Sequence, residues 1–240
     1  MTNKTIGLLF IMIGLNMATF TLANDIYITQ IGDNLDLDIT QDGTNNKVGN
    51  STTSTSINGD GMNFDITQTG NLNTIVADIN GVNYTGTWVF TGSSNTVDLD
   101  CSSSAAGDCD DVTLNITATG DDNVFTFDVG EAHDGSNTVA NFTITGDHSI
   151  INSTINGKSA ELTVIINNSS SLATTSTASD EGVAFTSVQT GNGDSAGHSA
   201  VVSITGGGGT MDINQSGIND QKVNIGITGN SFDVDITQSD

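Results

Sequence analysis

The chain has 240 residues, with 28 Asp and Glu against four Lys, no Arg and a formal net charge of −24. Phosphates of nucleic acid and anionic membrane surfaces are bound through basic side chains, so we expect neither as a partner. Proline would remove a donor from a strand ladder, and the chain has none. With 28 Gly, few aromatics and no apolar period of 3.6 residues beyond the N-terminal segment, the sequence predicts an all-β chain without helix.

Residues 1–23 are predicted to be a secretory signal peptide. One lysine, Lys4, precedes an apolar run that starts at Ile6, and small residues end the segment at Ala23. An uncleaved anchor is the alternative, but a Gly and an Asn interrupt the run, which is short for a membrane span. We therefore expect cleavage after Ala23, a secreted extracellular or cell-surface protein, and no membrane insertion of the mature chain.

Residues 24–240 are predicted to form one domain built from strand-turn-strand repeats. The stretch from Phe64 to Ile79 shows the unit, which consists of two alternating arms on either side of Gly70. Residues two apart in a strand share one face. Gln68 therefore points to the same side as the apolar residues before the turn, and Asn73 to the same side as those after it.

The glycine of this turn recurs along the chain, at Gly32, Gly43, Gly70, Gly92, Gly120, Gly146, Gly191 and Gly217. From Gly43 onward, with Asn168 and Asp240 in the place of a glycine, the turns lie 27, 22, 28, 26, 22, 23, 26 and 23 residues apart. A repeat in the twenties with two arms per unit is typical of a β-solenoid. The predicted fold is a two-sheet β-solenoid.

Amides occupy the inward positions that flank many of these turns. A buried amide without a hydrogen bond costs about 1–3 kcal/mol, whereas amides stacked about 4.8 Å apart bond to one another as a ladder. We therefore predict an inward amide ladder that sets the register and supports self-assembly, made of Gln30, Gln41, Asn46, Gln68, Asn73, Asn95, Asn123, Gln189, Gln215 and Gln238.

The cysteines and histidines suggest no catalytic or metal site. Cys101 and Cys109 have seven residues between them, and in an exported chain a disulfide is the expected use of such a pair. His133, His148 and His198 lie in different repeats and show no paired spacing. We predict no metal, no cofactor and no enzymatic activity.

The pattern Q-x-G-x-x-N occurs in full at residues 41–46 and 68–73, each time between alternating strands. It resembles the curlin repeat, and the likeness covers nearly the whole mature chain, at full strength only in scattered units. Curlins are the subunits of curli, the extracellular amyloid fibres of bacterial biofilms. The resemblance implies a fibre subunit that polymerises end to end for cell adhesion and biofilm matrix. It also implies a nucleator subunit and an outer-membrane export channel as partners.

The ends of the mature chain favour the same interpretation. A repeat arm begins at Ile26, close to the predicted cleavage point, and another arm, residues 232–238, comes just before the last residues. A solenoid exposes unpaired backbone at its terminal coils, and soluble solenoids cover it with caps. We expect uncapped ends that stack on one another.

A monomeric solenoid that binds ice or a surface glycan is the alternative. Such a protein would use an outward face of Thr and Asp. Threonine recurs three residues before the turn, at Thr29, Thr40, Thr67, Thr117, Thr143 and Thr237. Threonine is also a common outward strand residue, and other residues interrupt the series. The outward acidic pairs Asp36/Asp38 and Asp233/Asp235 fit a solvated face better than a calcium site.

Overall fold

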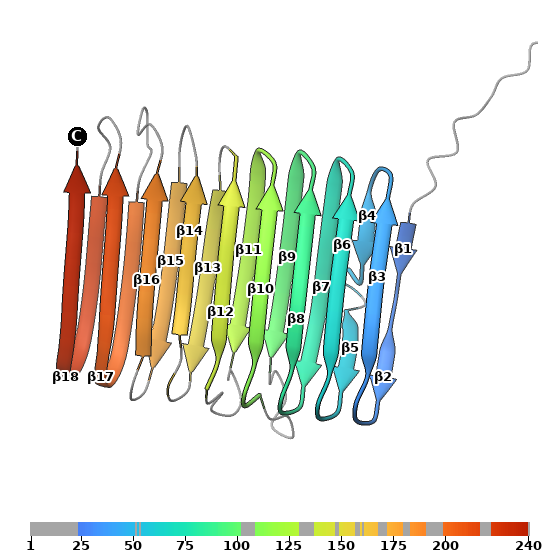
Figure 1. The fold of residues 1–240 in the computed structure, drawn as a ribbon, viewed down its shortest axis with the longest axis horizontal. Helices are drawn as coiled ribbons and strands as arrows, with labels where there is room; N and C mark the ends of the chain where they lie inside the picture. Colours follow the sequence, from blue (N-terminus) through green and yellow to red (C-terminus); the bar gives the residue numbers. More distant parts are fainter. Residues whose placement is uncertain are drawn as a thin grey trace, which may run out of the picture.

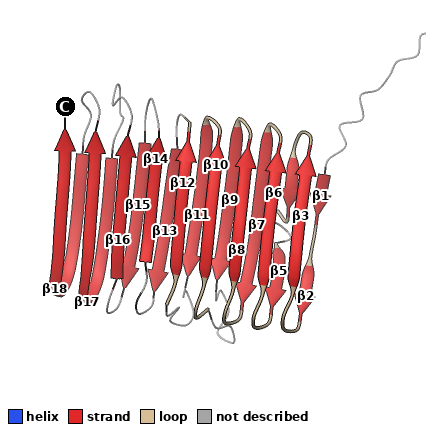
Figure 2. Cartoon of the chain, viewed as in Figure 1, coloured by secondary structure: helices blue, strands red, loops and turns tan. Residues whose placement is uncertain are grey.

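The computed structural model describes residues 24–50, 52, 54–101, 109–129, 137–146, 149–156, 159, 161–167, 172–179, 183–190, 199–216 and 222–239. The predicted signal peptide, the three histidines, and the turns at Gly191 and Gly217 lie outside these residues. All regular structure in the described part is β-strand (Figure 2). It contains no helix that is long and apolar enough to cross a bilayer.

The strands wind into a solenoid in which each coil adds one arm to each of two facing sheets (Figure 1). We call the sheet that contains Gln41 the Gln sheet. Its strands are β3 (Asp36–Asp42), β6 (Asn63–Thr69), β8 (Thr85–Thr91), β10 (Thr113–Thr119), β12 (Val139–Thr145), β14 (Glu161–Asn167) and β16 (Val183–Thr190). We call the other the Asn sheet; it holds β1 (Asn24–Ile26), β2 (Thr29–Ile31), β4 (Asn46–Val48), β5 (Thr55–Asn58), β7 (Leu72–Asn80), β9 (Ser94–Cys101), β11 (Asp122–Val129), β13 (Ser149–Asn156) and β15 (Leu172–Ser179).

The last two strands, β17 (Ser199–Ser216) and β18 (Lys222–Ser239), run on from one sheet into the other. Every coil-to-coil pairing is parallel and in register, so that Ile66 lies between Ile39 of the preceding coil and Trp88 of the following one. This arrangement confirms the predicted two-sheet β-solenoid.

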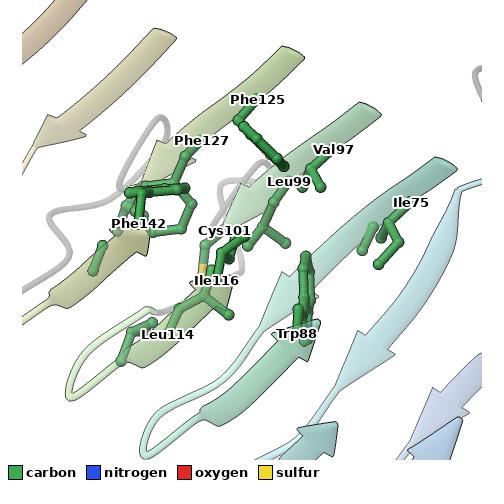
Figure 3. Packing of buried hydrophobic residues seen from close by; sticks show 14 of the residues in the cluster. Ile75, Trp88, Val97, Leu99, Cys101, Leu114, Ile116, Phe125, Phe127 and Phe142 are labelled. Carbon is green, nitrogen blue, oxygen red and sulfur yellow. The ribbon is translucent and has the colours of Figure 1, made fainter. Parts of the chain in front are cut away.

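The core fills the space between the two sheets because alternate residues of every arm point inward. Figure 3 shows such side chains from successive coils lying together. Aromatic rings connect the sheets: Phe127 of the Asn sheet meets Phe142 of the Gln sheet edge to face, with ring centroids 5.7 Å apart. Trp88 is fully buried and donates from Nε1 to the carbonyl oxygen of Phe64 at 2.9 Å.

Where the structure describes it, the corner that follows an arm of the Gln sheet is short and built around a glycine. This tight corner leads from the Gln sheet to the Asn sheet and contains Gly43, Gly70, Gly92, Gly120 and Gly146. Its N–H groups bond to the next coil; Gly43 donates to the carbonyl oxygen of Thr69 at 2.9 Å. A Cβ at Gly70 would overlap the carbonyl oxygen of Gly43. Close stacking of backbones therefore requires glycine here.

The assignment of Gly32 and Gln30 to this series was wrong. Gly32 lies at the opposite corner, in line with Gly59 and Gly81, and Gln30 pairs with Ile57 in the Asn sheet. Gln30 donates from Nε2 to the carbonyl oxygen of Gly32 at 2.5 Å and joins no ladder of glutamines. The physical reason is spacing: Gly32 lies 11 residues before Gly43, which is half of a 22-residue coil. Thr29 is displaced in the same way, and it pairs with Ser56.

The opposite corner varies in length from coil to coil. Between β9 and β10 it holds the predicted disulfide, Cys101 to Cys109, whose Cα atoms are 5.9 Å apart. Replacing both cysteines by alanine is expected to lower the free energy of unfolding by about 2–3 kcal/mol, because a closed loop restricts the unfolded chain. Urea unfolding of the oxidised protein and the double variant measures this difference. Equal midpoints would contradict it.

Tyr84 has a fully buried hydroxyl that no described group bonds in good geometry, because the nearby Trp88 N–H donates to the carbonyl oxygen of Phe64 instead. Burial also raises the pKa of this phenol well above its ordinary value. Tyr84→Phe is expected to raise the free energy of unfolding by about 1 kcal/mol, because an unpaired buried polar group is destabilising. Tyr27→Phe is the control, since the exposed hydroxyl of Tyr27 accepts from Asn50 Nδ2 at 2.7 Å. A loss of stability in Tyr84→Phe, measured by urea unfolding, would show that its hydroxyl is paired.

Candidate self-assembly ladders

Four buried asparagines form a continuous ladder just after the tight corner. Asn46 donates from Nδ2 to Asn73 Oδ1 at 3.1 Å, Asn73 to Asn95 Oδ1 at 2.8 Å, and Asn95 to Asn123 Oδ1 at 2.8 Å. Asn123 continues to Ser149 Oγ at 3.3 Å. All five side chains are buried. Because each amide has its partner in the neighbouring coil, the ladder fixes the stacking register.

The same amides also bind the backbone of the tight corner. Asn46 Nδ2 reaches the carbonyl oxygen of Thr69 at 2.9 Å, and Asn73 Nδ2 reaches that of Thr91 at 3.1 Å. Asn123 Nδ2 donates to the carbonyl oxygen of Gly120 at 2.6 Å. An amide nitrogen has two hydrogens, so one side chain can serve the ladder and the turn together.

A second ladder occupies the Gln sheet at both ends of the solenoid. Gln68 donates from Nε2 to Gln41 Oε1 at 2.7 Å, and Gln238 donates to Gln215 Oε1 at 2.9 Å. The row between them is apolar. In register, the full row is Gln41, Gln68, Phe90, Ala118, Ile144, Ile166, Gln189, Gln215 and Gln238. Of Gln189 the structure describes the backbone only.

The two ladders donate in opposite directions. Each ladder asparagine gives its hydrogen to the following coil, whereas Gln68 and Gln238 give theirs to the preceding coil. Gln68 Oε1 has no partner among the described atoms, because Phe90 stands where the next glutamine would be. Within the described part, the Gln ladder is thus interrupted inside the solenoid and present at its two ends.

Sequence reasoning missed one member of the Asn row. Asn24 pairs with Asn46 in register, and the signal was available, because the two lie 22 residues apart, the length of a short coil. At the other end Ser149 pairs with Leu172, so leucine follows serine in this row. By strand register, Asn24 extends the row of asparagines to the first described coil; of Asn24, as of Leu172, the structure describes the backbone only.

Threonines form two columns on the outward face of the Gln sheet. One runs through Thr40, Thr67, Val89, Thr117 and Thr143, and the other through Thr69, Thr91, Thr119 and Thr145. All but the half-buried Val89 and Thr143 are exposed. The columns make a regular array of hydroxyl and methyl groups, in strand register from coil to coil.

Carboxylates stack on the outward faces as well. Asp38 pairs with Asp65, Asp212 with Asp235, and Asp100 with Asp78 in one coil and Asp128 in the other. Within the described ranges, no three His, Cys, Asp or Glu side chains gather so that they could hold a metal ion.

Comparison of the chain with family models, with curated proteins and with solved structures gives no match. The ladders, the corners and the outward columns are therefore the basis for assigning a function.

Proposed function

We propose that the protein is a structural, non-enzymatic subunit of extracellular curli-like fibres, which assembles end to end for cell adhesion and biofilm matrix. The observation that carries this proposal is the pair of amide ladders. Their hydrogen bonds run along the stacking axis and link each coil to the next. Parallel, in-register stacking with amide ladders is the geometry of cross-β fibres.

The edge of the last described coil supports the proposal. Ile236 of β18 is 46% exposed, whereas Ile213, the equivalent residue one coil earlier, is 1% exposed. An edge strand with exposed apolar side chains and unpaired backbone is a template for another chain. A second copy seated on this edge would bury these groups as the inner coils bury theirs.

Electron microscopy of the purified chain tests the proposal. We expect unbranched fibres with a diffraction spacing of about 4.8 Å along the axis. Fibre growth should be faster at about 0.15 M salt than at about 0.01 M. The added salt shortens the Debye length from about 30 Å to about 8 Å and so screens the repulsion between copies that each carry a net charge of −24. A chain that stays monomeric by light scattering for days, at high concentration and raised salt, contradicts the proposal.

The threonine columns favour a second candidate function, the binding of ice by a monomeric solenoid. The observation is the regular outward array over β6, β8, β10 and β12. Thermal hysteresis separates the two functions. Fibres without hysteresis support the structural subunit, and hysteresis without fibres supports ice binding. Thr117→Lys, in the middle of the array, should abolish hysteresis in the second case and leave fibre growth intact in the first.

A further inference from the structure

The first and last described coils share one sequence pattern. Residues 26–41 and 223–238 align without a gap and are identical at seven of 16 positions. The identical pairs are Ile28 and Ile225, Gly32 and Gly229, Asp36 and Asp233, Asp38 and Asp235, Ile39 and Ile236, Thr40 and Thr237, and Gln41 and Gln238. The match spans an arm of each sheet and the corner between them, so two such coils can pair along both arms at once.

From this match we infer the seam between copies, an inference that rests on the proposed function. The outer edge of β18 receives the first coil of the next copy, head to tail, with Gln238 opposite Gln41 and Val223 opposite Ile26. Within the chain, β17 and β18 already pair in this gap-free way, with Ala200 opposite Val223 and Gln215 opposite Gln238. The seam therefore repeats a contact that the fold itself makes.

Apolar side chains meet across this seam. On the last coil, Ile227 is 37% exposed, and Val223, Ile225 and Val234 are only partly buried against the core. On the first coil, the partly buried apolar residues are Ile26, Ile28, Leu35 and Leu37. In the inferred register these two incomplete layers cover each other, as adjacent inner coils do.

The Gln ladder continues through the seam with its direction unchanged. Gln238 already donates to Gln215, and Gln68 donates to Gln41. Placing Gln41 of the next copy on Gln238 lets its Nε2 donate to Gln238 Oε1, in the same sense. The two end segments of the ladder then join into one run across each junction.

Charges favour the inferred register at one arm of the seam and oppose it at the other, and the opposed contact adds to the expected salt dependence. Lys222 comes opposite Asp25 of the next copy, and in the strand register of its own chain Asp25 already lies opposite Lys47. One carboxylate then lies between two ammonium groups, which favours this register. In the Gln sheet, Asp233 and Asp235 come opposite Asp36 and Asp38, and like charges directly opposite are destabilising. The seam needs this second contact to be screened.

Cysteine cross-linking in the fibres tests the register. Thr40 and Thr237 are exposed and come opposite each other at the seam, about 4.8 Å apart, within the Cα range of a disulfide. After mild oxidation, fibres of Thr40→Cys/Thr237→Cys should give a covalent ladder on a denaturing gel, that is, a series of bands for dimers, trimers and longer species. The buried Cys101–Cys109 disulfide is unaffected. In the control Thr67→Cys/Thr237→Cys, Thr67 lies one coil farther from the seam, and no ladder should form.

The outcomes separate the seam from the proposed function. Fibres without the covalent ladder, or a ladder from the control, overturn the seam and leave the fibre subunit standing. Dimers from Thr237→Cys alone show tail-to-tail contact and also overturn it. Absence of fibres from the unmodified chain overturns the proposed function and the seam with it.

Gly32→Ala gives a second, independent test. Within the chain, a Cβ at Gly32 meets only Gln30 Nε2 at 3.8 Å, whereas a Cβ at Gly59, one coil later, overlaps the carbonyl oxygen of Gly32. In the seam, Gly32 stacks on Gly229 of the preceding copy. A Cβ at Gly32 would then overlap the backbone of Gly229, as a Cβ at Gly59 overlaps that of Gly32. The variant should fold as a monomer and elongate fibres at least tenfold more slowly. Elongation at the rate of the unmodified chain would overturn the seam.

Discussion

Replacing Asn95 with leucine is expected to lower the free energy of unfolding by about 3 kcal/mol, although leucine has a similar volume. Asn95 accepts from Asn73 and donates to Asn123, both at 2.8 Å in the buried core. The substitution removes both bonds and leaves a donor of Asn73 and the acceptor of Asn123 facing an apolar side chain. Each unpaired buried group costs about 1–3 kcal/mol. Urea unfolding measures the loss.

Asn115 provides the matched control for this variant. It accepts from Asn141 Nδ2 at 2.9 Å, between neighbouring coils, but on the exposed face. Water can replace that bond, so Asn115→Leu is expected to change stability by no more than about 0.5 kcal/mol. Equal losses in the two variants would show that the buried ladder contributes no more than an exposed amide pair.

Gly81→Ala is expected to lower the free energy of unfolding by about 4 kcal/mol. Gly81 has a φ of +145°, where a side chain is strained by about 1–3 kcal/mol. A Cβ at Gly81 would also overlap the carbonyl oxygen of Gly59. Forcing the two coils apart costs about 1–3 kcal/mol more. Thermal and urea unfolding both report this loss.

Gly32→Ala separates the two contributions. Gly32 lies at the same corner with a φ of +128°, but a Cβ there meets no backbone atom of a preceding coil. Only the conformational strain of about 1–3 kcal/mol remains. If Gly32→Ala destabilises the chain as much as Gly81→Ala, close stacking is not the reason for glycine at this corner.

The alternation of side chains was enough to predict the fold and most of the ladder positions. Period-two patterning places Asn46, Asn73, Asn95 and Asn123 inward, and these four residues are buried. The spacing of the turns from Gly43 onward predicts the register of the whole Gln row, since each turn starts a new coil. Both inferences depend only on local geometry, which the sequence carries directly.

The sequence could not tell the two corners apart at the N-terminal end. Both corners use a glycine after an alternating arm, so Gly32 looked like Gly43 although it belongs with Gly59 and Gly81. Only the pairing of whole arms distinguishes them. The opposite directions of the two ladders were equally hidden, because the orientation of an amide depends on which neighbouring coil supplies its partner.

The disulfide at the variable corner makes the positions of the flanking strands independent of the length of the segment between the two cysteines. Cys101 closes β9, Cys109 leads into β10, and the bridge holds their Cα atoms 5.9 Å apart. The ends of the intervening segment are thereby clamped, whatever its length, and β9 and β10 keep their places. Foreign peptides grafted between these cysteines would leave the winding of the coils unchanged. In a fibre, such grafts would be displayed once per subunit at a constant interval.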